Sequence, residues 1–301
     1  MKTPSLKYWI IAMRPWSFPA AVMPALVAMA FLISRQGISL VETSCVHMLL
    51  IVLAAVLIQA GGNIISDYYD FKYKVDRKET FGSSRMLVDG IFEPRTLMVF
   101  SLVLFAIASA IGVYLALVTS INLLWLGLLG MVLALFYYKF KYSALGDVFV
   151  FLTFGQMIAW GTGIILTSHM LWELLVIAAP VGLLIVAILH ANNMRDMQYD
   201  QAVPIKTVSV MLGLKRAQVY YALLEILPYV IVIGFVVFGF QKPYVLITGI
   251  TLPLAINNIR KANRATRHTL SDIKDLDGDS AKLVVAFSTV FIITLIMNFY
   301  L

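Results

Sequence analysis

The first segment of the chain with residue types suited to chemistry follows a long apolar run. Asn63, Asp67 and Asp70 stand there at positions i, i+4 and i+7. A helix that continued through this segment would place all three side chains on one stripe. Ionised carboxylates at a membrane helix end are costly unless they are paired or functional. The spacing therefore predicts an acidic face at a helix end.

A second segment repeats this pattern after another apolar run. Asn192, Asp196 and Asp200 are spaced four residues apart, and Asn193 and Arg195 lie between them. Carboxylates converging from two helices would repel one another unless cations lay between them. Hard carboxylate and amide oxygens suit Mg²⁺, which commonly binds together with substrate phosphates. We interpret the two segments as a clamp for Mg²⁺ and a diphosphate.

The elements that position these segments are predicted to be membrane helices. Of 301 residues, 61% are hydrophobic and only 13% are charged, and mean hydropathy is +0.89. These values lie outside the range of ordinary soluble domains. The lone Cys45 excludes an internal disulfide and a cysteine metal cluster. Apolar runs long enough to span a bilayer occur near 16–34, 46–66, 96–119, 122–138, 147–167, 171–192, 217–240, 243–259 and 282–300.

The distribution of positive charge predicts how these nine helices are oriented. All of the 23 Lys and Arg residues except Arg35 and Lys242 fall on one side of the alternating spans. The positive-inside rule then places the N-terminus and the large loops in the cytoplasm and the C-terminus outside. The net charge of +7 is mainly a topological signal. We expect no nucleic-acid partner, because basic and acidic residues are interleaved and no soluble binding module is evident.

Aromatic and basic residues near the same membrane face have two interpretations. Arg14 either anchors an interfacial N-terminal segment or meets an anionic substrate. Tyr137 and Tyr138 either belong to an aromatic belt or line a pocket in which an allylic cation forms. Lys139 and Lys141, close to these tyrosines, could contact diphosphate oxygens. The residues alone leave these alternatives open.

Later residues add one basic candidate and several structural expectations. Lys206, after the second acidic segment, is a candidate phosphate contact. We expect His190 to be a buried hydrogen-bonding group rather than a base. The acidic stretch at 272–279 is similar to a calcium loop but has Leu283 where that loop needs its last Glu, so we interpret it as an interfacial turn.

The predicted fold is all-α, a polytopic membrane bundle of nine helices. The two acidic segments end the second and sixth helices, so four helices separate equivalent positions. This spacing favours two pseudo-repeated four-helix units plus one further helix, with the site between the units. We treat residues 1–301 as a single transmembrane domain.

The order of the motifs resembles that of UbiA-type intramembrane aromatic prenyltransferases. Among them, the chain is most similar to 1,4-dihydroxy-2-naphthoate polyprenyltransferases of menaquinone synthesis. The motifs that carry the resemblance are Arg14-Pro15, the segment Asn63 to Asp70 with the further Asp76, Arg85 to Gly90, Leu145-Gly146-Asp147 followed by Phe154-Gly155, and the segment Asn192 to Asp200.

The resemblance implies Mg²⁺-dependent transfer of a prenyl group from a polyprenyl diphosphate to an aromatic acid, with loss of the ring carboxylate in the naphthoate case. The implied metal ligands are Asp67, Asp70, Asp76, Asp196 and Asp200. The catalytic set comprises Asp67, Asp70, Asp196, Asp200, Tyr137 and Tyr138. The substrate-binding set comprises Arg14, Asn63, Arg85, Lys139, Lys141, Asn192, Asn193, Arg195 and Lys206.

The implied setting is a bacterial cytoplasmic membrane, with membrane lipid around the bundle. Two groups of alternatives remain. Related enzymes could use 4-hydroxybenzoate or homogentisate as the acceptor, or farnesylate haem. A cation-coupled transporter could also place paired Asp residues in a cavity between repeats. The clustering of the acids with Lys and Arg at helix ends favours the enzyme.

Overall fold

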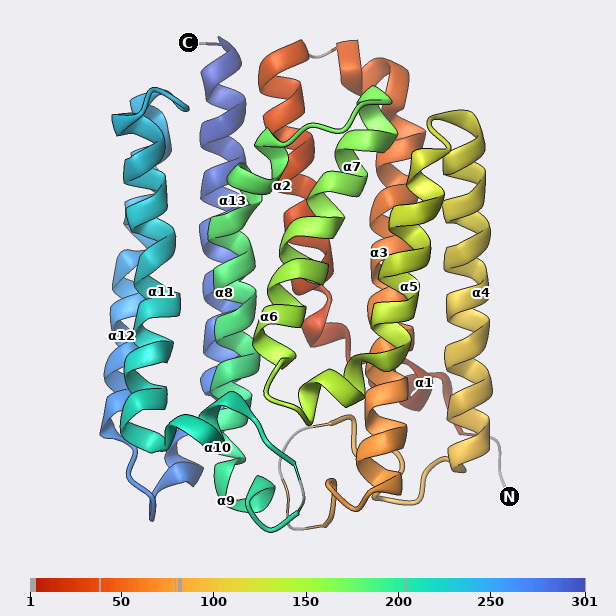
Figure 1. Cartoon of the computed structure of the whole chain (residues 1–301), viewed down its shortest axis with the longest axis vertical. Coiled ribbons are helices and arrows are strands. Elements are labelled where there is room, and N and C mark those ends of the chain that lie inside the picture. Colours follow the sequence, from red (N-terminus) through yellow and green to blue (C-terminus); the bar gives the residue numbers. More distant parts are fainter. Residues whose placement is uncertain (1–3, 38, 79, 81–82, 204, 301) are drawn as a thin grey trace.

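The computed structural model describes residues 4–37, 39–78, 80, 83–203 and 205–300, and these residues form an almost entirely helical bundle (Figure 1). Within them, eight helices are long and apolar enough to cross a membrane. The spanning elements are α2 (Pro19–Gln36), α3 (Ser39–Lys72), α4 (Pro94–Val118), α5 (Asn122–Lys141), the continuous α6, η2 and α7 (Gly146–Val150, Phe151–Met157 and Ile158–Thr167), α8 (Glu173–Arg195), α11 (Leu214–Val237) and α13 (Leu276–Tyr300).

The predicted polytopic helical fold is confirmed, but one predicted span has a different form. The segment expected at 243–259 is a 3₁₀-helix, η3 (Pro243–Thr251), which continues into α12 (Leu252–Arg264). A 3₁₀-helix rises more per residue than an α-helix. Together, η3 and α12 therefore extend along α11, and both pack against it (Figure 1). The predicted relation between two four-helix units stays a prediction.

Short elements gather at the end of the bundle where the acidic segments lie. The loops after α3 and α8 lie at this end, and the C-terminus lies at the other (Figure 1). Trp9 packs edge-on against Phe92 and Phe100, which holds the first short helix beside α3 and α4. The short elements are α1 (Leu6–Ala12), η1 (Pro15–Ser17), α9 (Met197–Asp200), α10 (Val208–Leu212) and η4 (Leu270–Ile273).

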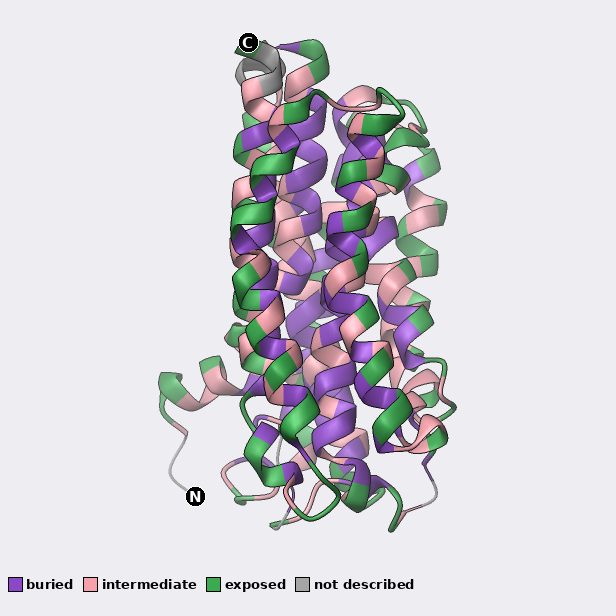
Figure 2. Cartoon of the chain, turned by 90° about the vertical axis from the view of Figure 1, so that its left-hand side faces the viewer, coloured by how far each residue is buried: buried purple, intermediate pink, exposed green. Residues whose placement is uncertain are grey.

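Burial follows what a lipid-exposed bundle requires. Figure 2 shows buried residues along the interior of the helices and exposed residues on their outward faces and in the loops. The outward faces carry large apolar side chains such as Leu117, Trp125 and Val237. Lipid tails are as apolar as these side chains, so such faces are stable in a membrane. The main core lies between α2, α8, α11 and α13, where α8 packs against the other three helices and α2 packs against α13.

A π-helical segment, η2, approaches α8 closely. A Cβ atom built on Gly155 would lie 2.8 Å from the Cα of Gly182 in α8. Only glycine permits this approach of two backbones. The wider π turn changes the direction in which the following side chains point. Thr153, Phe154 and Met157 of this turn line the central cavity described below.

Candidate active site between two acidic segments

A cavity of about 1280 Å³ lies inside the bundle and reaches the end where the acidic segments are. Most of its wall is apolar and comes from α3, α5, η2, α7 and α8. Polar residues gather at one end of the cavity. They include Arg14, Asn63, Ser66, Tyr137, Lys141, Asn192, Arg195 and Asp277. A long apolar chamber with a charged mouth suits a molecule with an apolar tail and an anionic head.

The first acidic segment lies on the last turns of α3, as the spacing predicts. Both carboxylate oxygens of Asp67 are hydrogen bonded. Arg14 Nη1 donates to Oδ1 at 3.2 Å, and the backbone amide and hydroxyl of Ser84 donate to Oδ2 at 2.9 and 2.6 Å. Asp67 is buried. It therefore fastens the N-terminal segment and the loop after α3 to the helix.

Arg14 reaches Asp67 because the backbone turns sharply at this residue. Its φ of 57° is in the left-handed region, which is costly for a residue with a side chain. Asn63 Nδ2 donates to the carbonyl of Met13 at 3.0 Å and thereby fixes the turn. The Nε atom of Arg14 is buried and has no hydrogen-bond partner among the described residues. Arg14 thus retains an unused donor at the cavity wall.

Asp70 is held by groups from the end of α5. Lys141 Nζ donates to Oδ2 at 2.8 Å, and the Tyr142 hydroxyl donates to Oδ1 at 2.6 Å. Ser66 adds a longer contact of 3.4 Å to Oδ2. Burial and the negative charge of Asp70 raise the pKa of Tyr142. Tyr142 therefore remains a hydrogen-bond donor at neutral pH.

The second acidic segment departs from the predicted straight helix. α8 ends at Arg195, and Asp196 links it to the short α9 with φ −89° and ψ 2°. The amides of Asp196 and Asp200 still donate to carbonyls four residues earlier, at 3.0 and 2.9 Å. The predicted stripe is therefore interrupted by a change of direction. Charged partners at this position stabilise the bend.

Arg195 is the centre of those partners. Its Nε and Nη2 atoms donate to the two carboxylate oxygens of Asp196 at 2.9 and 2.7 Å, and Nη1 donates to Asp277 at 3.0 Å. Nη2 also donates to the side-chain oxygen of Asn192. Arg195 is buried, so these charge-assisted bonds offset its desolvation. They join α8 to the beginning of α13.

The carboxyl groups outside the spans show that the site holds excess negative charge. Burial, with the nearby Asp70, raises the pKa of Asp76 to about 7, although Lys141 opposes the shift. Burial also raises the pKa of Asp200 to about 7, again against Lys141 and with Asp196 and Asp70 adding to the shift. Burial raises the pKa of Asp196 as well, against the effect of Arg195. Lys141, which pairs with Asp70, thus lowers the pKa values of acids in both segments.

The donor set fits a hard cation shared with a substrate. Among the described residues, no three His, Cys, Asp or Glu side chains are close enough together to hold a metal ion by themselves. Mg²⁺ is usually held by one or two carboxylates, waters and substrate phosphates rather than by a complete protein cage. Asp76 and Asp200 favour a further positive charge, because their carboxyl groups retain protons near pH 7 without one.

Several residues predicted for catalysis or substrate binding lie away from the cavity wall. Tyr138 stacks on Tyr69 with ring centroids 3.7 Å apart, and Lys139 Nζ lies 5.0 Å from the ring centroid of Phe136. Asn193 is buried on α8, and Arg85 pairs with Asp89 at 3.1 Å. The backbone of Lys206 forms a β-bridge with Ser143, and Lys206 is exposed. Their roles stay predictions.

Other functional candidates emerge only from the structure. Tyr142 lies in the same aromatic run as Tyr137 and Tyr138, but only Tyr137 and Tyr138 were predicted to be functional. Asp277 lies in the stretch interpreted as an interfacial turn, yet it lines the cavity and holds Arg195. The four Asp residues in the stretch 272–279 were the available signal. The expectation for His190 is confirmed, since its ring is buried with both nitrogens within 3.2 Å of oxygen partners.

Solved structures share the fold. A UbiA homolog from Aeropyrum pernix K1 matches with a TM-score of 0.69 and 18% identity, covering 91% of this chain and 97% of that one. A UbiA homolog from Archaeoglobus fulgidus, described as bound to DMAPP and Mg²⁺, matches with a TM-score of 0.59 and 14% identity over 94% and 98% of the two chains.

Sequence comparisons give the family. UbiA prenyltransferase domain-containing protein 1 of Danio rerio is 32% identical over 229 residues, which are 74% of this chain and 66% of that protein. The chain thus spans about two thirds of the length of this relative. The Drosophila melanogaster homolog is 30% identical over 271 residues, 87% of this chain and 74% of that protein. Residues 21–283 match the UbiA prenyltransferase family, and the chain therefore belongs to that family.

Proposed function

We propose that the chain transfers a polyprenyl group from a polyprenyl diphosphate to an aromatic acid in the membrane. The observation that carries the proposal is the apolar cavity whose polar end is lined by residues of both acidic segments and by Lys141, which pairs with Asp70. An isoprenoid tail would occupy the apolar chamber, and the diphosphate would lie at the charged end. Homologs from Archaeoglobus fulgidus are described as bound to DMAPP or GPP and Mg²⁺, which supports a prenyl diphosphate and Mg²⁺ as ligands here.

We assign the magnesium ligands to four of the five predicted acids. Asp70 and Asp76 would contribute from one segment, and Asp196 and Asp200 from the other. Asp67 is assigned instead to positioning, because its Oδ2 accepts from the backbone amide of Ser84, whereas the donors to Asp70 and Asp196 are side chains that can give way to a cation. When bound, Mg²⁺ would neutralise the diphosphate and stabilise the charge that develops on the leaving oxygen.

The basic residues at the mouth would bind the diphosphate directly. Arg14 has an unused buried donor at the cavity wall, and Lys141 and Arg195 line the same space. Charge-assisted hydrogen bonds from these groups are stronger than neutral ones. They would hold the diphosphate so that its bond to the allylic carbon lies at the boundary between the polar and apolar parts of the cavity.

The apolar wall would protect the reactive carbon from water. When the carbon–oxygen bond breaks, the electron pair leaves with diphosphate, and the allylic carbon becomes electron deficient. Tyr137 lines this part of the cavity, and the face of its ring can stabilise positive charge. An electron-rich ring carbon of the acceptor then forms the new carbon–carbon bond. Exclusion of water prevents capture of the cation as an alcohol.

For the acceptor we propose 1,4-dihydroxy-2-naphthoate, whose carboxylate is lost as CO₂, which places the enzyme in menaquinone biosynthesis. The support is the order of the motifs, from Arg14-Pro15 to the segment that ends at Asp200. 4-Hydroxybenzoate and homogentisate are the alternative acceptors. We further propose that the acidic segments and the N-terminus face the cytoplasm of a bacterial cell, because nearly all Lys and Arg residues lie on that side.

The test uses the full chain in lipid vesicles with a labelled polyprenyl diphosphate. Each of the three aromatic acids is supplied separately, with Mg²⁺ or with a chelator. We expect a prenylated, decarboxylated naphthoquinol that forms only with Mg²⁺. Transfer to another acid would change the acceptor but keep the reaction. Absence of transfer to every aromatic acid would overturn the proposed function.

A further inference from the structure

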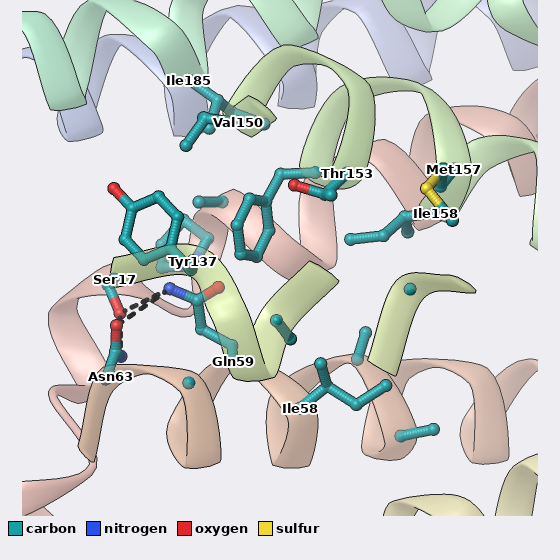
Figure 3. A pocket seen from close by; sticks show the side chains of 18 of the residues that line it. Ser17, Ile58, Gln59, Asn63, Tyr137, Val150, Thr153, Met157, Ile158 and Ile185 are labelled. Atoms are coloured by element: carbon teal, nitrogen blue, oxygen red, sulfur yellow. Dashed lines mark hydrogen bonds between the residues drawn. The ribbon is translucent and has the colours of Figure 1, made fainter. Parts of the chain in front are cut away.

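Gln59 lies on α3 one turn before Asn63 and lines the central cavity (Figure 3). Its amide nitrogen donates to Ser17 Oγ at 3.2 Å and to Asn63 Oδ1 at 3.4 Å. Asn63 Nδ2 in turn donates to Ser17 Oγ at 2.8 Å, and Ser17 Oγ donates to the carbonyl of Arg14 at 2.8 Å. These bonds form one small network at the cavity wall.

The network determines which way the Gln59 amide points. Ser17 has a single hydroxyl proton, which is committed to the Arg14 carbonyl, so Ser17 can only accept from Gln59. Asn63 presents its oxygen to Gln59, because its own amide protons go to Met13 and Ser17. Both Gln59 protons are therefore used, and the amide oxygen remains on the other side.

That oxygen is an acceptor without a donor. Gln59 is 8% exposed, and its Oε1 atom is buried with no hydrogen-bond partner among the described residues. A buried acceptor left unpaired is unfavourable, so an acceptor of this kind in a cavity wall is suited to a ligand donor. The surrounding wall is apolar, with Ile58, Val150 and Ile185 lining the same cavity (Figure 3).

The position of Gln59 along α3 indicates which ligand would reach it. Gln59 precedes Asp67 by eight residues, about 12 Å along the helix axis. If the diphosphate is held near Asp70 and Lys141, its allylic carbon would lie on the side toward Gln59. The aromatic acceptor would lie beside that carbon, closer to Gln59. Tyr137 lines the cavity between these regions. The free acceptor atom thus lies at the level of the second substrate.

We propose that Gln59 Oε1 accepts a hydrogen bond from a ring hydroxyl of the aromatic acceptor and so selects hydroxylated rings. This inference rests on the proposed function and adds a residue that determines acceptor specificity. A site built to bond a hydroxyl rejects the analogue that lacks it, because its buried polar group is then unpaired. The Ser17 and Asn63 bonds hold the amide ready for this role.

The test compares wild type with Gln59→Leu in lipid vesicles. Binding of 1,4-dihydroxy-2-naphthoate is measured as its KM, and binding of 1-hydroxy-2-naphthoate and 4-hydroxy-2-naphthoate as competitive inhibition constants. We expect Gln59→Leu to weaken the dihydroxy acceptor about tenfold. The monohydroxy analogue that lacks the hydroxyl bonded to Gln59 should bind equally weakly to wild type and to Gln59→Leu. The KM for polyprenyl diphosphate should be the same in both proteins.

Gln156→Leu is the matched control, because Gln156 is also 8% exposed and has an unpaired amide nitrogen but does not belong to the cavity lining. It should leave the acceptor KM unchanged. Equal weakening of all three ligands in Gln59→Leu, or no weakening, would overturn the inference. If Gln59→Leu does not fold, the three ligands are compared on the wild-type protein alone. Equal binding of all three to the wild type would overturn the inference. Absence of any prenyl transfer refutes the proposed function instead.

Discussion

Replacement of Lys141 by Met tests whether this ammonium group is the resident cation of the acidic site. Lys141 Nζ lies 2.8 Å from Asp70, with side chains 21% and 4% exposed. Removing one partner of a buried pair costs about 3–5 kcal/mol. Asp70 keeps its hydrogen bond from Tyr142 at 2.6 Å. We therefore expect the lower end, a loss of about 3 kcal/mol in the free energy of unfolding at pH 8 without Mg²⁺.

The loss should depend on pH because other acids share the same cation. Lys141 lowers the pKa values of Asp76 and Asp200, which burial has raised to about 7. Without the ammonium group these carboxyls are charged at pH 8 with less compensation, whereas at pH 5.5 they are protonated in both proteins. The destabilisation should therefore be smaller at pH 5.5, and Mg²⁺ should reduce it at pH 8.

The assay is denaturant unfolding in micelles followed by tryptophan fluorescence. Lys261→Met is the control, because Lys261 also lies 2.8 Å from an aspartate, Asp279, but in a pair whose side chains are 30% and 22% exposed. We expect this control to lose about 0.5 kcal/mol. The reasoning is refuted if both variants lose the same stability, or if the loss in Lys141→Met is the same at both pH values.

Two further predictions follow from acidity and packing. Asp76 and Asp200 have pKa values of about 7 in the folded chain against an ordinary 3.8, so the metal-free protein should lose stability as pH rises from about 4 to 7. Mg²⁺ affinity, measured by calorimetry, should rise over the same range, and equal affinity at pH 6 and 8 would contradict this. Gly155→Ala should lower the free energy of unfolding by about 1–3 kcal/mol, because its Cβ would lie 2.8 Å from the Cα of Gly182. Gly234→Ala is the control and should not destabilise the bundle, because a Cβ there has no neighbour within 4 Å. Similar melting temperatures of the two variants would refute the packing argument.

Most of the fold could be predicted, because membrane spans are recognised from long runs of apolar residues. The spacing of Asn63, Asp67 and Asp70 also correctly predicts a helix that continues to the loop, since α3 reaches Lys72. The change of direction at Asp196 could not be predicted, because Arg195 pairs both with Asp196 beside it and with Asp277, which is distant in the chain. The 3₁₀ form of η3 likewise has no clear pattern in an apolar run.

The chemical class of the site could also be predicted, but not its network. The prenyltransferase family inferred from the motifs is confirmed by the match over residues 21–283, whereas the menaquinone branch stays a proposal. Hydropathy and spacing cannot show that Lys141 pairs with Asp70 or that Asp277 reaches Arg195. These contacts join residues far apart in the chain, and only the folded backbone brings them together.

The central claim is that the two acidic segments bind one diphosphate as a unit. Single-turnover prenyl transfer by Asp70→Asn, Asp200→Asn and the double variant tests it most directly. Residues that act as a unit show strongly non-additive losses. We expect each single variant to lose nearly all transfer and the double variant to lose little more. Additive losses, or wild-type transfer by either single variant, would contradict the claim.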